Sequence, residues 1–245
     1  MADRLRFVVV MAVTVLVVGV CLEFLPSSPL RGTLRDDRVR LNGEVALRTE
    51  GAHAWVMTQP GDPSVPVRYD PCRVVEVVVN PAGAPPQAVP LVRSALARVD
   101  AVTGLDLEYA GASGARPHWD EDQLPVVDAG GTPPVLVSWA TAAQVPALVG
   151  DVAGLAASVA RADRRGRLTF VTGQVTLDSD EFATLATEPE GRARMRAVLL
   201  HELGHLVGLA HVADPGELMN ERLGVLDYGP GDLAGLARLG RGPCA

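Results

Sequence analysis

Three of the five histidines in the chain lie in one short stretch, HELGHLVGLAH, residues 201–211. If this stretch begins as a helix, His201 and His205 lie on one face, with Cβ atoms about 5–6 Å apart. Two imidazoles at that separation can bind one zinc ion, at Zn–N distances of about 2.0–2.1 Å. The spacing therefore predicts a metal site, and Zn²⁺ is the cofactor that it favours.

A glutamate follows directly after the first of these histidines. Glu202 is displaced from His201 by about 100° around the helix. From there its carboxylate would reach a water molecule on the metal rather than the metal itself. A carboxylate in that position can act as a general base. The sequence thus predicts Glu202 as the catalytic residue, beside His201 and His205 as metal ligands.

A third ligand, His211, requires that the helix end soon after His205. On a continuing helix, six further residues would carry His211 roughly 240° around the axis, away from His205. Gly208 lies where the chain could turn, because glycine adopts the left-handed conformation that ends many helices. Three histidines leave a fourth zinc position open for water, as in catalytic sites. His53 and His118 lack partners at ligand spacing, so we expect ordinary surface or loop histidines there.

The extended motif is similar to that of a known family. H-E-x-x-H-x-x-G-x-x-H, followed by Met219 within GELMN, resembles the metzincin metalloproteases, and the spacing from His211 to Met219 is like that of the matrixin branch. YGPGDLAGLARLG resembles the matrixin C-terminal helix, and DPCRVVEVVVN resembles the start of the domain more loosely. The resemblance is to bacterial matrixin-like proteins and covers residues 69–245.

The resemblance implies a fold and an activity. The fold would be α/β, a metzincin-like zincin with a twisted mixed sheet, two long helices and a small C-terminal part after the zinc motif. The activity would be that of a zinc-dependent endopeptidase, acting on a peptide or protein substrate with a zinc-activated water and a glutamate base. Met219 would form a floor beneath the zinc and would not be a ligand. An edge strand within Gly154 to Asp163 would pair with the substrate.

The sequence also departs from the matrixin pattern. Asn220-Glu221 stands where that pattern usually has Tyr-Pro, so the wall of the pocket past the scissile bond should differ. Cys72 lies in DPCRV, which lacks the surroundings of the family's inhibitory cysteine motif. Asp178, Asp180 and Glu181 could bind calcium, although a solvated acidic turn is the simpler interpretation.

Two other functions fit the same residues. One is an exported, non-catalytic binding module that keeps zinc as a structural element. Such a module should lack Glu202 or add a fourth protein ligand, and the sequence shows neither feature. The other is a zinc hydrolase with a non-peptide substrate, which the motif does not exclude.

Composition bounds the class of protein. A chain of 245 residues with 48% hydrophobic content can hold one ordinary domain plus extensions. The net charge is −7 and the pI is about 5.2, whereas a nucleic-acid partner would require a basic face. We therefore expect no nucleic-acid partner, and the composition does not indicate an oligomeric state.

The first 25 residues have the layout of an export signal. Arg4 and Arg6 precede an uncharged apolar run, Phe7–Leu22, and no A-x-A-like cleavage site follows. The segment could also span a bilayer, which needs roughly 17–25 residues. Residues 1–25 are thus predicted to be a signal peptide or, preferably, an uncleaved membrane anchor, with the catalytic domain outside the cell; the alternative is a secreted protein. Four arginines within residues 31–40 count against this orientation under the positive-inside rule.

Two cysteines bracket the predicted domain. Cys72 and Cys244 suit a disulfide in an oxidising compartment, which agrees with export. Two free buried thiols are the alternative.

The remaining elements follow from hydrophobic periodicity. Residues 26–68 contain scattered prolines and are predicted to form a stalk or linker, with a short strand pair around 45–47 and 54–56. Residues 69–245 are predicted to form the metalloprotease domain. Its expected strands are 73–80, 105–109, 135–140, 154–163 and 167–178, and its expected helices are 85–104, 190–207 and 231–240. Strands and helices in this order are typical of an α/β layout with a mixed sheet.

Overall fold

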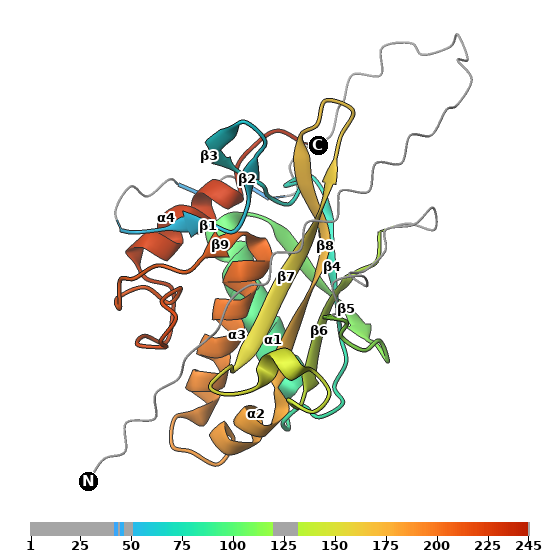
Figure 1. Ribbon diagram of the computed structural model, residues 1–245, viewed down its shortest axis with the longest axis vertical. Coiled ribbons are helices and arrows are strands. Elements are labelled where there is room, and N and C mark those ends of the chain that lie inside the picture. Colours follow the sequence, from blue (N-terminus) through green and yellow to red (C-terminus); the bar gives the residue numbers. More distant parts are fainter. Residues whose placement is uncertain (1–41, 44, 47–50, 120–131, 245) are drawn as a thin grey trace.

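A computed structural model describes residues 42–43, 45–46, 51–119 and 132–244. It confirms the predicted α/β class, with a twisted mixed sheet covered on one face by two long helices (Figure 1). The hydrophobic segment predicted at residues 1–25 lies outside the described residues. Within the described part of the chain, no helix is long and apolar enough to cross a membrane.

The central sheet has five strands in the order β5-β4-β6-β8-β7. They are β4 (Val74–Val79), β5 (Asp106–Ala112), β6 (Val135–Ala140), β7 (Gly154–Ala162) and β8 (Leu168–Asp178). Four of them run parallel, whereas β7 runs antiparallel beside β8 and forms one edge. Val75, Val77 and Val79 alternate toward the buried face, as the period of a strand requires.

The two long helices are α1 (Ala88–Thr103) and α3 (Gly191–Val207). α1 buries its apolar stripe and ends at Gly104, whose φ of 71° lies in the left-handed region that favours glycine. α3 is buried without interruption over residues 197–207, because it lies between the sheet and the C-terminal part of the chain. The shorter helices are α2 (Ser179–Leu185), α4 (Pro230–Leu239) and the 3-10 turn η1 (Pro146–Leu148).

Four short strands lie outside the central sheet. They are β1 (Ala54–Trp55), β2 (Thr58–Gln59), β3 (Asp62–Pro66) and β9 (Leu209–Ala210). The strand expected around residue 54 exists, but the partner predicted for it at residues 45–47 is wrong: Ala54 pairs with Ala210, and neither 45 nor 46 is in a strand. The chain before residue 69 therefore adds a strand next to the histidine motif. The predicted domain boundaries stay predictions.

The predicted disulfide is confirmed. Cys72 and Cys244 are bonded, with their Cα atoms 5.4 Å apart, and they are separated by 172 positions in the sequence. The alternative of two free thiols is therefore wrong. The bond joins Cys72, two residues before β4, to Cys244, after α4.

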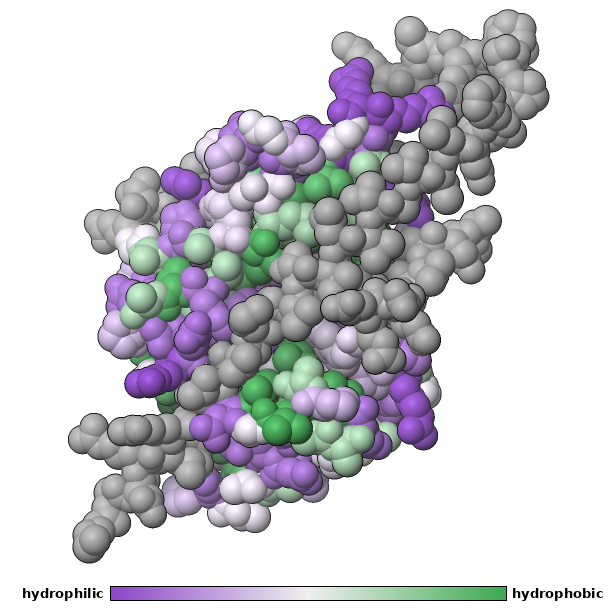
Figure 2. Space-filling model, viewed as in Figure 1, coloured by the Kyte–Doolittle hydropathy of each residue, from purple (hydrophilic) through white to green (hydrophobic). Residues whose placement is uncertain are grey.

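The visible surface is mostly hydrophilic, with hydrophobic side chains gathered in a few places (Figure 2). One exposed apolar side chain, Val149, follows η1 and has 68% of its area accessible. Leu148 beside it is buried in a small apolar cluster with Val152 and Leu155. This cluster supports the loop that leads from β6 into the edge strand β7.

Candidate metal centre

The second half of α3 carries three of the predicted site residues. His201, Glu202 and His205 are all buried, with at most 4% of each residue accessible. Their one-turn spacing brings the rings of His201 and His205 to a centroid distance of 4.7 Å. The helix therefore positions two imidazoles on one face, as their spacing predicts.

The helix ends at Gly208, where the prediction placed the turn. Gly208 has a φ of 124°, and its amide donates to the carbonyls of Gly204 and His205. The chain then runs through β9, which pairs with β1, and returns His211 to the helix. The ring centroid of His211 lies 5.1 Å from that of His201 and 4.5 Å from that of His205.

The three histidines converge through the same atom. His211 Nε2 lies 3.0 Å from His201 Nε2 and 2.9 Å from His205 Nε2. Two nitrogens bound to one zinc ion can be no more than about 4.2 Å apart, twice the Zn–N distance. Among the described residues, this group of three could hold one metal ion, and it includes no fourth side chain.

The hydrogen bonds behind the rings decide which nitrogen faces the centre. His201 Nδ1 lies 2.6 Å from Leu218 O, and His205 Nδ1 lies 2.7 Å from Leu209 O. A carbonyl can only accept, so each Nδ1 carries the hydrogen and each Nε2 presents a lone pair. Metal-binding histidines are typically oriented in this way. Buried lone pairs that face one another need a cation or a proton between them, so the residues present fit a metal ion.

The protonation states agree with this fit. Burial, with a smaller contribution from His211, lowers the pKa of His201 to about 3. Burial also lowers the pKa of His205 and of His211. The imidazoles are therefore neutral near pH 7, which is the form that binds metals.

Glu202 presents an unsatisfied carboxylate beside the histidines. Its Oε1 atom is buried and has no hydrogen-bond partner in the protein. Burial raises the pKa of Glu202 to about 8, and a bound dication nearby would oppose that shift. A buried polar oxygen without a partner costs free energy, so this oxygen fits a site at which a bound ion or its water would contact it.

A glycine makes room for this carboxylate. A Cβ atom on Gly154 would lie 2.8 Å from Glu202 Cγ and 3.0 Å from its Oε1. Gly154 is the first residue of β7, so the edge strand begins in contact with the candidate base. The sequence predicts a strand that begins at Gly154 but not this contact, because a contact between distant positions leaves no local pattern.

Met219 packs beneath α3. It is 1% accessible, and a Cβ atom on Gly204 would lie 2.5 Å from its sulfur. Gly204 immediately precedes His205, so the thioether lies against the helix next to a candidate ligand. This is a packing position, as expected for the floor residue.

Two buried carboxylates that the sequence pattern does not single out hold the segment around Met219. Asp232 accepts hydrogen bonds from the amides of Leu218 and Gly229, at 2.5 and 3.0 Å. Glu217 accepts from the amides of Gly231 and Asp232, at 2.8 and 2.9 Å. Leu218 in turn accepts from His201, so Asp232 supports a ligand through one intervening residue. The signal that could have identified Asp232 is its place three residues after Gly229, where an acid reaches back to cap a helix.

The other sequence candidates lie elsewhere. Asp178 accepts from the amides of Asp180 and Glu181 and so caps α2, and the candidate metal-binding groups among the described residues do not include these acids. Asp178 is buried, as is Glu181 Oε1, so the expected solvated turn is wrong for these two side chains. His53 lies against Trp55, and the His118 amide donates to Gln174. Neither histidine joins the group of three.

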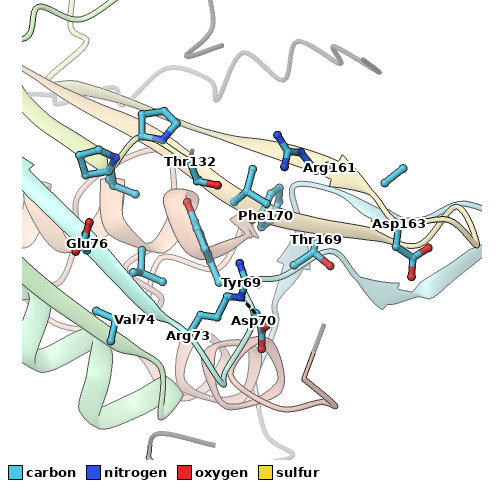
Figure 3. A pocket seen from close by; sticks show the side chains of 16 residues that line it. Tyr69, Asp70, Arg73, Val74, Glu76, Thr132, Arg161, Asp163, Thr169 and Phe170 are labelled. Carbon is cyan, nitrogen blue, oxygen red and sulfur yellow. Dashed lines mark ion pairs between the residues drawn. The ribbon is translucent and has the colours of Figure 1, made fainter. Parts of the chain in front are cut away.

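A cavity of about 450 Å³ opens in another part of the molecule (Figure 3). It lies between the start of β4 and the β7–β8 hairpin, with Tyr69, Arg73 and Asp163 among the side chains that line it. None of the three histidines lines it, nor does Glu202. The chemistry of the histidine group is therefore independent of this cavity.

Comparison with known proteins agrees with the motif. Residues 141–230 match the sequence model of the family described as Matrixin. This range contains β7, β8, α3, all three histidines and Met219. No curated protein matches the chain.

Two solved structures share a general likeness with the chain. One is described as the GM1 bound form of the ECX AB5 holotoxin; it is 14% identical, with a TM-score of 0.45 over 81% of this chain and 93% of that one. The other is metalloproteinase-II from Bacteroides fragilis; it is 15% identical, with a TM-score of 0.36 over 73% of this chain and 52% of that one. Both TM-scores are below 0.5, so neither likeness supports a conclusion. Residues 141–230, which carry the histidine motif, are thus similar to the Matrixin family of metalloproteases.

Proposed function

We propose that the protein is a zinc-dependent endopeptidase. One observation carries the proposal: three neutral histidines converge through Nε2 next to a buried glutamate whose Oε1 has no partner. His201, His205 and His211 would hold the ion. When bound, zinc polarises a carbonyl group and lowers the pKa of water from 15.7 to about 7.

The chain's own contribution to the reaction is proton transfer by Glu202. Its carboxylate takes a proton from the attacking water, and the resulting carboxyl group gives that proton to the nitrogen of the leaving amine. The base returns to its starting state after one cycle. Its burial excludes bulk water, which would otherwise compete for the same proton.

The substrate would bind along the edge strand β7. β7 pairs with β8 on one side, and no other described strand pairs with it. An extended peptide could therefore add to the sheet through main-chain hydrogen bonds. Gly154 places the start of this edge beside Glu202, and Ser158 fixes the strand to α3 by donating to Leu206 O at 2.7 Å.

The proposed place of action is outside the cytoplasm, on the cell membrane or secreted. The disulfide between Cys72 and Cys244 supports this, since such bonds persist in oxidising compartments. The predicted signal or anchor at residues 1–25 agrees with it.

A substitution in Glu202 separates metal binding from chemistry. Glu202→Gln keeps the size of the side chain and an oxygen acceptor but cannot take up a proton near neutral pH. We expect the full-length variant, purified in a mild detergent, to bind zinc like the wild type and to cleave an unfolded protein about 10²–10⁴-fold more slowly. Bound zinc is measured by elemental analysis, and cleavage by fluorescence of a labelled substrate.

Two further variants complete the experiment. His205→Ala should lose zinc and activity together, because it removes a ligand. Glu108→Gln removes the same charge from an exposed position on β5 and should behave like the wild type. Full activity in Glu202→Gln would contradict the mechanism, and a wild type that binds zinc but cleaves no peptide would favour a structural zinc or a non-peptide substrate.

A further inference from the structure

We propose that Glu221 is a positioning residue for His211, acting on this ligand from behind the ring. The inference rests on the proposed function, because it assigns a partner to one of the three proposed ligands. It concerns the Asn220-Glu221 pair, at which the sequence departs from the matrixin pattern.

The three histidines differ in the group that faces the Nδ1 atom of each ring. The Nδ1 atoms of His201 and His205 donate to main-chain carbonyls. His211 Nδ1 instead faces a carboxylate, with Glu221 Oε1 at 3.8 Å. A charged side chain, rather than a main-chain carbonyl, thus lies near Nδ1 of one ligand of the three.

His211 is also the ligand that packing fixes least. His201 and His205 are buried on a helix, whereas the side chain of His211 keeps 14% of its area accessible and follows a two-residue strand. A ring with less support from its surroundings depends more on a specific partner for its orientation.

The loop that carries Glu221 is held by its neighbour Asn220. The Asn220 side-chain amide donates to Val212 O at 3.0 Å, and its oxygen accepts from the Arg222 amide at 3.0 Å. The Val212 amide donates to Met219 O at 3.0 Å. These bonds tie the residues on both sides of Glu221 to Val212, the residue that follows His211, so the backbone at Glu221 is held close to this ligand. Tyr-Pro at these two positions would supply neither the amide nor the carboxylate.

The contact should strengthen when metal binds. The distance of 3.8 Å is longer than a hydrogen bond, and because His211 is neutral near pH 7 the contact is not an ion pair in the metal-free protein. A dication at Nε2 draws electrons from the ring and makes the Nδ1 hydrogen more positive, which increases its attraction to the carboxylate. Loss of a partner behind a ligating histidine typically weakens metal binding about 10–100-fold. Because the Glu221 side chain is 65% accessible, solvent screens the pair, and we expect about tenfold.

The test measures zinc directly. The full-length wild type, Glu221→Gln and Glu221→Asp are compared by competition with a chelator and by the rate of zinc release into excess chelator. We expect Glu221→Gln to bind zinc about tenfold more weakly and to release it faster, and Glu221→Asp to recover part of the difference. Asp214→Asn, which removes one charge from an exposed position in the same loop, should match the wild type.

A second measurement separates this role from a general loss of structure. The metal-free forms of all variants should melt at the same temperature, whereas the increase in Tm on adding zinc should be smaller for Glu221→Gln. Wild-type affinity and release rate in Glu221→Gln would overturn the inference and leave the proposed function standing. Unchanged zinc binding with altered cleavage of peptides that carry a basic residue would mean that Glu221 contacts substrate, which also overturns it. A wild type that binds no zinc would overturn both.

Discussion

At the level of single residues, the candidate base Glu202 depends on Gly154, because only a residue without a side chain leaves room for its carboxylate. Glu202 is recognisable from sequence because its spacing from His201 and His205 is fixed by helix geometry. Gly154 is not, since its contact with Glu202 exists only after β7 and α3 have packed together. The histidine ligands and Glu202 can therefore be predicted from the local sequence pattern, whereas the packing around Glu202 cannot.

Gly154→Ala should consequently reduce activity without removing zinc. The added Cβ would overlap Glu202 and push its carboxylate aside, and a displacement of about 1 Å at a catalytic group can cost about 10²-fold in rate. We expect kcat/KM for peptide cleavage to fall by that order while bound zinc stays at the wild-type level. Gly114→Ala adds the same methyl group where no atom lies within 4 Å and should change neither quantity. Equal activity in the two variants would show that Glu202 does not need this space.

At the scale of elements, α1, α3 and the turn at Gly208 could be predicted, because long periodic segments and a glycine stop are strong local signals. The partner of β1 was predicted wrongly, since a two-residue strand has no periodicity and its pairing with β9 is decided by the packed structure. The support of His201 through Leu218 and the start of α4 was missed for the same reason. These unpredicted contacts are all long-range.

Asp232 gives a test of that support. Burial is the main cause that raises the pKa of Asp232 to about 6, so the carboxylate is mostly ionised at pH 7.5 and accepts main-chain hydrogen bonds. Asp232→Asn would turn an amide toward those N–H groups, at a cost of about 1–3 kcal/mol in the free energy of unfolding. Urea unfolding should show that loss, and zinc should dissociate faster because Leu218 no longer holds His201 in place. Asp180→Asn, in the exposed first turn of α2, should leave the free energy of unfolding and the zinc release rate unchanged. An unchanged zinc release rate in Asp232→Asn would mean that Asp232 does not support the metal centre.

At the scale of the whole molecule, the disulfide closes the chain from the start of β4 to the C-terminus. A bond across 172 positions restricts the unfolded chain by up to about 5 kcal/mol in the entropy model. Cys72→Ser should therefore lower the free energy of unfolding by a large part of that amount while the histidine group still binds zinc. The matched variant Cys244→Ser should lose the same amount, and the double variant no more than either one. Losses that add in the double variant would mean that the two cysteines stabilise the fold independently.

The pairing of β1 with β9 links the N-terminal chain mechanically to the metal centre. Ala54 and Trp55 lie opposite Ala210 and Leu209, and the Val56 amide donates to Gly208 O at 2.9 Å. The segment that turns the chain from His205 toward His211 is thus fastened to residues that precede the predicted domain boundary. A protein shortened to begin at residue 69 would keep all three histidines and lose the strand that holds the third one in place. A force applied to the chain ahead of β1 would act on these same hydrogen bonds, and their rupture would free the segment that carries His211.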